Sequence, residues 1–344
     1  MKKGVWVALA VLVAAAALRV AGGAGFWRRY LTTMQGGGAE SAAGLIAPRV
    51  RLPGGATELP RATAESALIA AEALQRAADT ARQQGAQALV VHRHGHRVFE
   101  YFAMDRSGAT EVAGGELAPA LLALSLGPLV DARRMEPAAA VAAIRDATRP
   151  DEDWRNPWSA AARRRFNLAP PPAALLLDLD GSIANTISSR IWLPLGAADA
   201  ALWGVDDSLL RLDCCVAARL DDWMRIGDLL LQQGTYQGQR IVSPDWIRQL
   251  LAADPDGRRH PVWLAEQRPW TGDEPPATRE IYWFDLGSDV RLWLVPRRGL
   301  AVLHWAGAGD SRDTLIPNTI LRGLLDQAPA VGGATELNDL VPGH

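Results

Sequence analysis

The amino-acid sequence predicts an α+β fold with one antiparallel sheet, helices packed on it and a mainly helical insertion. Two groups of strand-like segments lie near opposite ends of the chain. The first group covers 88–92 and 96–102, and the second covers 281–284, 291–295 and 300–305. Helical periods dominate between the two groups. Because tight turns join the neighbours within each group, both groups can complete a single sheet in one discontinuous domain.

The first 30 residues predict an export signal or a membrane anchor. An apolar run, Gly4–Leu18, follows two lysines and ends at Arg19. A helix over residues 4–27 would be roughly 36 Å long, which is enough to cross a bilayer, with Trp27 and Tyr30 at the interface. No clear Ala-x-Ala cleavage site follows the apolar run. We therefore favour a retained anchor over a cleaved signal peptide.

The sequence divides into an anchor, a flexible tether, a folded domain and a tail, at 1–30, 31–62, 63–330 and 331–344. The tether is rich in Gly, Ala and Pro and has no hydrophobic period. Within the domain, the sheet region is expected at 63–102 and 280–326. The helical insertion is expected at 103–279.

Signals for helix and turn boundaries support this division. A first helix is predicted from an N-cap at Thr63 to a stop at Gly85. A tight turn at His94-Gly95 joins the first two strands. The clearest helix of the insertion covers 218–233, and helical signals return after the last strand and continue to Leu325.

Composition excludes several functions. The 36 basic and 38 acidic residues give a formal net charge of -2, so no excess of positive charge is available to bind a nucleic-acid backbone. Lys2 and Lys3 are the only lysines, and every other basic residue is arginine. Arginine stays protonated and cannot act as a tunable base, so the folded domain has no catalytic lysine.

Five stretches resemble the serine β-lactamase-related hydrolases, the group that contains class C β-lactamases, carboxylesterases and nylon-oligomer hydrolases. They are Val90–Arg97, Arg190–Gly196, Cys214–Gly227, Gly234–Trp246 and Val290–Pro296. The resemblance extends over roughly residues 64–326. It implies a serine β-lactamase/penicillin-binding-protein-like fold.

The chemical motifs of that family are absent. A Ser-x-x-Lys pair supplies the nucleophile and its base, but the equivalent stretch Gly114–Pro119 contains neither residue. The second motif, Tyr-x-Asn, can match only Asn167, and the third, Lys-Thr-Gly or His-x-Gly, falls at 287–289. We therefore predict no catalytic residue. The vestigial pocket is expected to contain Gly115, Glu116, Pro119, Asn167, Gly287, Ser288 and Asp289.

One alternative is a phosphatase. The stretch Leu175–Thr186 resembles the first motif of haloacid-dehalogenase-type enzymes, in which Asp178 would attack phosphorus, Asp180 would act as acid and base, and Mg²⁺ would bridge the carboxylate and the phosphate. The lysine that holds phosphate is absent, and no strand-helix alternation surrounds Asp178, as a parallel sheet would require. A helix that ends at Asp180 is the favoured interpretation.

Two clusters of potential ligands have simpler explanations. His92, His94 and His96 have the spacing of one strand face, but the turn at the intervening glycine separates them, so we predict no metal site. Cys214 and Cys215 are adjacent, and neighbouring thiols bridge each other only with a strained peptide. We interpret both as packing residues in a buried segment.

The sequence as a whole predicts an exported pseudoenzyme anchored in the inner membrane, with its body on the periplasmic side. It needs no cofactor and acts by binding a ligand or a protein, such as an active hydrolase of the same family. The other alternative is a serine hydrolase with noncanonical residues. Ser311, His304 and Asp313 could form such a triad, although a serine that opens a helix is more often its N-cap.

Overall fold

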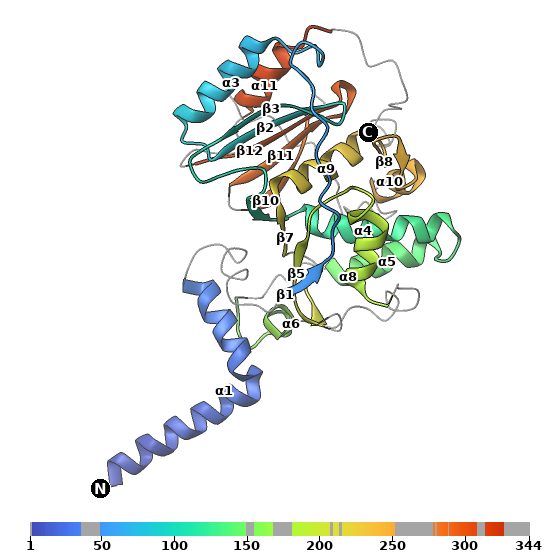
Figure 1. Cartoon of the computed structure of the whole chain (residues 1–344). Helices are drawn as coiled ribbons and strands as arrows, with labels where there is room; N and C mark the ends of the chain where they lie inside the picture. The colour runs from blue at the N-terminus through green and yellow to red at the C-terminus, as the bar shows by residue number, and fades with distance from the viewer. Residues whose placement is uncertain are drawn as a thin grey trace.

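The structure is a computed structural model, and Figure 1 shows sheets and surrounding helices with a long N-terminal helix extending from them. It describes residues 2–35, 49–148, 155–167, 181–206, 209–212, 215–251, 278, 281–287, 289–307 and 314–326. The predicted tail, 331–344, lies outside these ranges, as do Asp178, Asp180 and Ser311.

One five-stranded antiparallel sheet unites the two ends of the folded domain, in the order β10-β11-β12-β2-β3. Its strands are β2 (Ala88–Arg93), β3 (His96–Phe102), β10 (Tyr282–Gly287), β11 (Val290–Val295) and β12 (Leu300–Trp305). A short 3-10 helix, η2 (Pro296–Arg298), connects β11 to β12. Val302 of β12 pairs with Val91 of β2, so the two predicted strand groups meet in one sheet. The predicted antiparallel sheet is confirmed for these strands.

Helices cover both faces of this sheet. α3 (Ala71–Gln83) and α11 (Leu315–Arg322) share an apolar core with Leu89 and Val91, whereas α9 (Leu220–Leu231) packs on the opposite face, where Leu292 and Leu294 meet Gly227. The alternation of side chains along each strand supplies both cores. Every residue of β2 and β11 is buried for this reason.

The first helix starts later than the sequence predicts. α3 begins at Ala71, because Thr63 and Ser66 close a separate turn in which their hydroxyl oxygens lie 3.0 Å apart. The predicted turn at His94-Gly95 is confirmed. Both residues have positive φ angles, 50° and 79°, which match the twist of a two-residue hairpin.

A second antiparallel sheet lies where the sequence predicts a tether and a mainly helical insertion. Its order is β1-β5-β7-β4, with β6 paired to β5. The strands are β1 (Arg49–Leu52), β4 (Glu111–Ala113), β5 (Ala200–Asp206), β6 (Leu209–Leu210) and β7 (Val216–Arg219). Among the described residues, the expected single large sheet is thereby corrected to two five-stranded sheets. Such short strands show no clear hydrophobic period, and β1 is held by a partner far along the chain.

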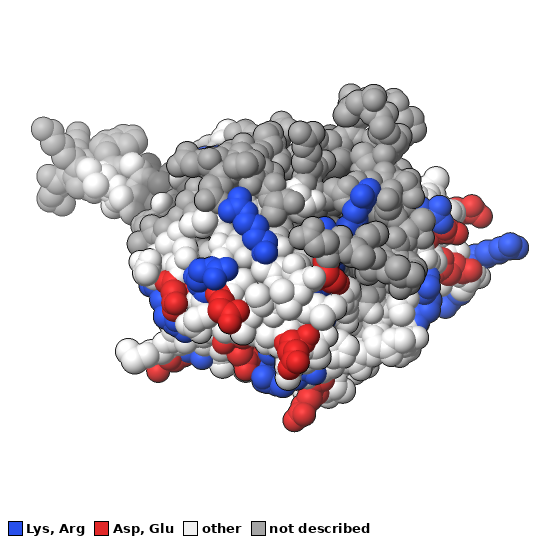
Figure 2. Space-filling view, turned by 90° about the horizontal axis from the view of Figure 1, so that it is seen from above, with Lys and Arg blue, Asp and Glu red and all other residues white. Residues whose placement is uncertain are grey.

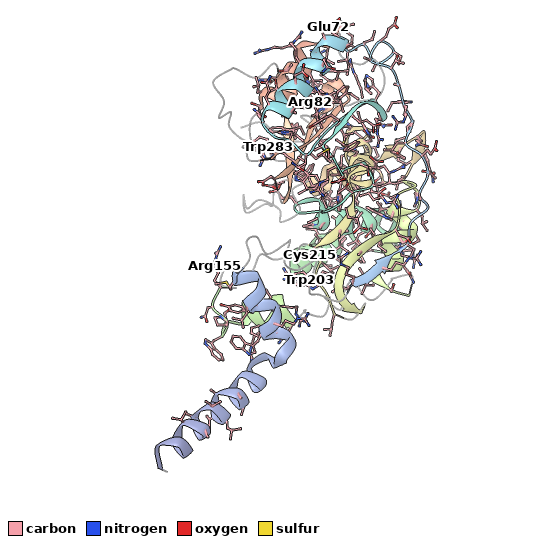
Figure 3. The ribbon with its side chains drawn as sticks, turned by 60° about the vertical axis from the view of Figure 1, so that its left-hand side comes forward. Glu72, Arg82, Arg155, Trp203, Cys215 and Trp283 are labelled. Atoms are coloured by element: carbon pink, nitrogen blue, oxygen red, sulfur yellow. The ribbon has the colours of Figure 1, made fainter. Side chains whose placement is uncertain are left out.

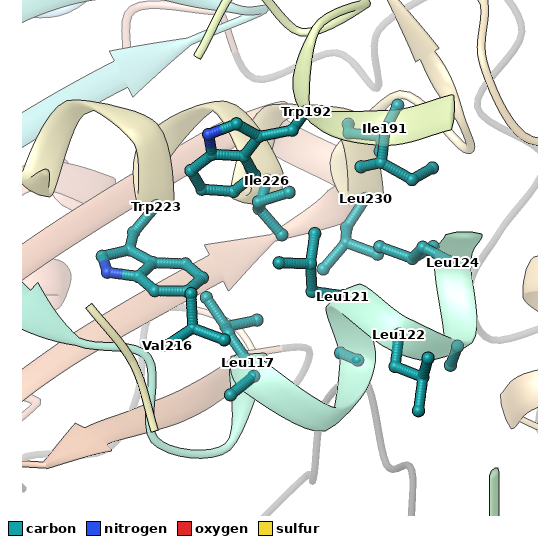
Figure 4. Close-up of a cluster of buried hydrophobic side chains, with 14 of the residues drawn as sticks. Leu117, Leu121, Leu122, Leu124, Ile191, Trp192, Val216, Trp223, Ile226 and Leu230 are labelled. Carbon is teal, nitrogen blue, oxygen red and sulfur yellow. The ribbon is translucent and has the colours of Figure 1, made fainter. Parts of the chain in front are cut away.

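The helical part of the insertion packs around α4 (Leu117–Asp131). The other elements are α5 (Pro137–Thr148), α8 (Ile183–Ile187), the π-helix η1 (Ser188–Trp192), α10 (Pro244–Leu251) and the hairpin β8 (Thr235–Tyr236) with β9 (Gln239–Arg240). Figure 4 shows Leu117 and Leu121 of α4 facing Trp192 and Trp223. The two indoles meet edge to face, with ring centroids 6.0 Å apart. Trp192, Trp223 and Trp246 are all buried in the core.

Helix α1 (Lys2–Gln35) differs from the predicted membrane span. It changes direction part-way along (Figure 1), and Gly23 within it has a φ of 70°, a conformation that a regular helix does not contain. Within the described residues, no helix combines the length and hydropathy needed to cross a membrane. Tyr30, expected at a membrane interface, is buried against α6 (Ala160–Asn167) instead.

Candidate functional site

The start of α4 is the position where the implied family would carry its nucleophile. Gly115 has a φ of 45° and lies against the backbone of β10. A Cβ atom at this position would lie 2.2 Å from the carbonyl oxygen of Asp285 and 2.6 Å from Cα of Leu286. These separations are far below van der Waals contact. The backbone of β10 therefore occupies the space that a serine side chain would need.

Glu116 strengthens the contact between the start of α4 and β10 through two hydrogen bonds to Asp285. Its backbone N–H donates to the carbonyl oxygen of Asp285 at 2.8 Å, and its carboxylate accepts from the backbone N–H of Asp285, also at 2.8 Å. The second bond is charge-assisted, and such bonds are among the stronger ones in proteins. The carboxylate of Glu116 is thus hydrogen-bonded to the backbone of strand β10.

Gly114 is enclosed from the other side. Its N–H donates to the carbonyl oxygen of Val216 at 2.7 Å. A Cβ atom here would meet the indole of Trp223 at 2.5 Å. The indole N–H itself donates to Val112 at 3.3 Å. The segment that leads into α4 is thus held between β7, β10 and an aromatic side chain of α9.

The turn between β10 and β11 contains the predicted third-motif position. Gly287 has a φ of 78°, and its N–H donates to the carboxylate of Asp285 at 2.9 Å. Asp289 is exposed, and its carbonyl oxygen accepts from the N–H of Ala306. Ser288 lies outside the described residues. The turn is thus organised by Asp285, a residue that sequence reasoning did not single out.

Asp285 also lies beside a buried arginine. Its carboxylate is 3.4 Å from the guanidinium of Arg291, which is 2% exposed. The same guanidinium lies over the rings of Trp283 and Trp293, at 5.2 and 5.6 Å from their centroids. Stacking on aromatic rings suits a planar, weakly hydrated cation. The contacts of Asp285 with Arg291 thus help to hold β10, the strand whose backbone lies against Gly115.

The remaining predicted pocket residues are not all in one place. Pro119 is half-buried in the first turn of α4. Asn167 is exposed at the end of α6, and the neighbouring Phe166 packs on Phe26 of α1. Figure 1 places α6 beside α1, apart from α4 and β10. The structure brings Gly115 and Glu116 to β10 but leaves Asn167 elsewhere.

A buried polar network lies behind this region, and the sequence gave no sign of its pairing. His92 Nδ1 is 2.7 Å from the carboxylate of Asp228, and both side chains are fully buried. Arg225 donates to the hydroxyl of Tyr236 at 3.0 Å. Burial raises the pKa of Tyr236 and also the pKa of Asp222. Both groups are therefore held in their neutral forms more strongly than in water.

The three histidines of the first hairpin point to different environments. His92 is buried, His94 lies at the turn, and His96 is exposed. Burial is the main cause that lowers the pKa of His94. In the described part of the chain, no group of three His, Cys, Asp or Glu residues is arranged to hold a metal ion.

Cys215 corrects the interpretation of the cysteine pair as packing thiols. Cys215 is disulfide-bonded, and Cys214 is the other cysteine of the sequence. Cys215 has a φ of 76°, and its carbonyl oxygen accepts from the N–H of Trp203 at 3.0 Å, as their neighbouring positions in Figure 3 illustrate. The backbone conformation of the two residues could not be judged from their adjacency in the sequence.

Comparison with solved structures identifies the fold. A putative 6-aminohexanoate-dimer hydrolase from Bacillus anthracis superposes with a TM-score of 0.53 and 13% identity, covering 80% of this chain and 90% of that one. The chain has the fold of the β-lactamase-like serine hydrolases. EstCE1, a hydrolase with promiscuous acyltransferase activity, matches with a TM-score of 0.50 and 12% identity, over 76% of this chain and 100% of its own.

A family VIII carboxylesterase also has this fold, with a TM-score of 0.50, 11% identity and coverage of 78% of this chain and 99% of the esterase. The fold implied by the five sequence stretches is thereby confirmed. No family model and no curated protein matches the sequence.

Proposed function

We propose that this protein is a pseudoenzyme with the fold of β-lactamase-like serine hydrolases, attached to a membrane and acting by binding. The contact between Gly115 and the backbone of β10 carries the proposal, because it leaves no room for a nucleophile at the start of α4. The absence of lysine from the folded domain removes the base that would activate one. Glu116 is committed to Asp285 and serves as a structural group.

The proposal predicts no covalent reaction with a penicillin-type probe or a fluorophosphonate. Both probes trap an activated serine, and neither the nucleophile nor its base is in place at α4. Intact-protein mass spectrometry of the full chain should show the unmodified mass, beside an active esterase of the same fold as a positive control. One probe molecule added per chain would overturn the proposal. Loss of that adduct in Ser288→Ala or Ser311→Ala would then assign the chemistry to a noncanonical serine.

The phosphatase alternative has little support. Every pairing between the described strands of the two five-stranded sheets is antiparallel. The implied phosphatase requires a parallel sheet, at whose edge Asp178 would stand. Asp178 and Asp180 themselves lie outside the described residues.

Membrane attachment is proposed through the first half of α1, residues 2–17. The apolar side chains described within this stretch, between residues 7 and 17, are exposed, among them Val7 at 63% and Leu12 at 66%. An apolar helix surface of this kind is stable when lipid or protein covers it. The disulfide at Cys215 supports an oxidising compartment for the body, so we place it on the periplasmic side of the inner membrane.

We expect the full chain to sediment with membranes and the chain lacking residues 1–30 to stay in the supernatant, because the deletion removes the exposed apolar surface. Protease added to spheroplasts should digest the body of the full chain. A cytoplasmic protein that resists the protease serves as the control. Recovery of the full-length chain in the soluble fraction, or protection of its body from protease, would contradict attachment or orientation respectively.

The binding role is proposed toward a ligand or an exported protein, such as an active hydrolase of the same fold. A proximity-labelling enzyme fused to the C-terminus should enrich such a protein over a control that carries only residues 1–35. No enrichment over that control would contradict a protein partner.

A further inference from the structure

The second half of α1 is fixed to a segment far along the chain. Phe26 and Phe166 are both fully buried, and their ring centroids are 6.1 Å apart. Tyr30 lies 5.4 Å from the ring of Phe166, and its hydroxyl donates to the carbonyl oxygen of Arg155. Arg29 donates to the carbonyl oxygen of Phe166 at 2.5 Å. Residues 2–35 and 155–167 therefore form one unit, called here the α1–α6 unit.

The α1–α6 unit has a one-sided charge. It contains two lysines and seven arginines and no acidic residue, although the whole chain has a formal net charge of -2. Three acidic residues, 151–153, lie just before the segment 155–167 in the sequence and offset only part of this charge. The rest of the chain therefore has an excess of acidic residues. On the face of the body in Figure 2, basic and acidic side chains are intermixed.

The surface of the unit combines this charge with tryptophan. Arg28, Arg155 and Arg163 are exposed. Trp158 is 62% exposed, and its ring centroid is 5.6 Å from that of Trp27. Arginine beside tryptophan is the composition that favours the headgroup region of a bilayer, where the indole lies among the polar groups and the cation meets phosphate.

The order of the apolar and aromatic residues along α1 determines how deep in a bilayer this surface would lie. The exposed apolar side chains described between residues 7 and 17 precede the aromatic residues that hold α6, separated by fewer than three helical turns. If the apolar part enters the bilayer, residues 26–30 lie near the headgroups, and α6 must lie there with them. We propose that the α6 side of the unit is a second membrane contact that selects anionic phospholipid. This inference rests on the proposed attachment through α1. It adds to that attachment a preference for anionic phospholipid at the α6 side of the unit.

The test places a fluorescent label on each side of the molecule in the full chain. Asn156→Cys labels the proposed contact, and Glu72→Cys on α3 is the control at the opposite end, as Figures 1 and 3 show. The natural cysteines are not expected to react without reductant, since Cys215 is disulfide-bonded. Each protein is reconstituted into vesicles of phosphatidylcholine alone or with phosphatidylglycerol, and headgroup-linked quenchers are added.

We expect quenching at Asn156 and none at Glu72, with stronger quenching when phosphatidylglycerol is present. Arg155→Gln/Arg163→Gln should lower the ratio of quenched to unquenched label by about 25-fold in anionic vesicles, because each arginine near an anionic surface contributes about fivefold. Arg76→Gln/Arg240→Gln removes two exposed arginines elsewhere and should leave the ratio unchanged.

The outcomes separate the two proposals. A chain that floats with vesicles but shows equal quenching at both labels, or no effect of phosphatidylglycerol, overturns the second contact and leaves attachment through α1 intact. Loss of signal in both double variants alike overturns the role of Arg155 and Arg163. A chain that does not float with either vesicle overturns the attachment and, with it, the lipid contact.

Discussion

Gly115→Ser is expected to destabilise the protein strongly and to create no hydrolase. The substitution places a Cβ atom 2.2 Å from the carbonyl oxygen of Asp285, and backbone cannot move aside as a side chain can. The residue must also keep a φ of 45°, which costs L-amino acids about 1–2 kcal/mol. We expect the free energy of unfolding to fall by about 3–5 kcal/mol in total. Urea denaturation followed by tryptophan fluorescence measures it.

Two variants separate the causes. Gly238→Ala also has a positive φ, 78°, but no atom of the described residues lies within 4 Å of the new Cβ, so it should cost only about 1 kcal/mol. Gly115→Ala should match Gly115→Ser, because the Cβ atom and not the hydroxyl makes the collision. If Gly115→Ser proves as stable as Gly238→Ala, strand β10 does not lie against α4 as described. Ester hydrolysis gained by the serine variant would refute the claim that β10 leaves no room for a nucleophile at the start of α4.

Asp228→Ala is expected to cost about 1–3 kcal/mol of unfolding free energy, because it leaves the fully buried imidazole of His92 without its hydrogen-bond partner. His92 lies in β2 and Asp228 in α9, so the pair also joins the β10-β11-β12-β2-β3 sheet to the helix that packs on its face. The same chemical denaturation measures the loss. The exposed pair Arg51–Asp199 is the matched control, and Asp199→Ala should cost far less than Asp228→Ala because water screens an exposed pair.

A double-mutant cycle tests the coupling directly. His92→Leu and Asp228→Leu should each destabilise, whereas the double variant should lose clearly less than the sum, since removing both polar groups leaves no buried polar group without its partner. Additive losses would mean that the two side chains do not depend on each other. The distance of 2.7 Å would then have no energetic significance.

Much of the central sheet could be predicted from the sequence. The apolar runs at β2, β11 and β12 and the turn at His94-Gly95 are local signals, because a strand buried on both faces is apolar at nearly every position. The second sheet could not be predicted in this way. Strands such as β1 and β4 have four and three residues, and pairing across long sequence separation, rather than local pattern, decides that they are strands.

For the candidate site, too, some features could be predicted from the sequence and others could not. The absence of lysine from the folded domain and of serine from Gly114–Pro119 can be read directly from the sequence. The contacts of Gly115 and Glu116 could be known only from the folded structure. A glycine has no side chain whose type would indicate a neighbouring residue. A glutamate can accept a hydrogen bond from many kinds of donor, so the sequence does not indicate which one it meets. Here both face β10, whose residues lie far away in the chain.

The N-terminal helix gives the last contrast. Its apolar and basic composition is a property of the sequence, so a membrane-directed segment could be predicted without a structure. The role of Tyr30 was decided by tertiary packing, because Phe166 and Arg155 come together with it only in the folded chain. The composition of a segment determines whether it favours a membrane, water or a protein core. The tertiary contacts of the folded chain determine in which of these environments an individual side chain lies.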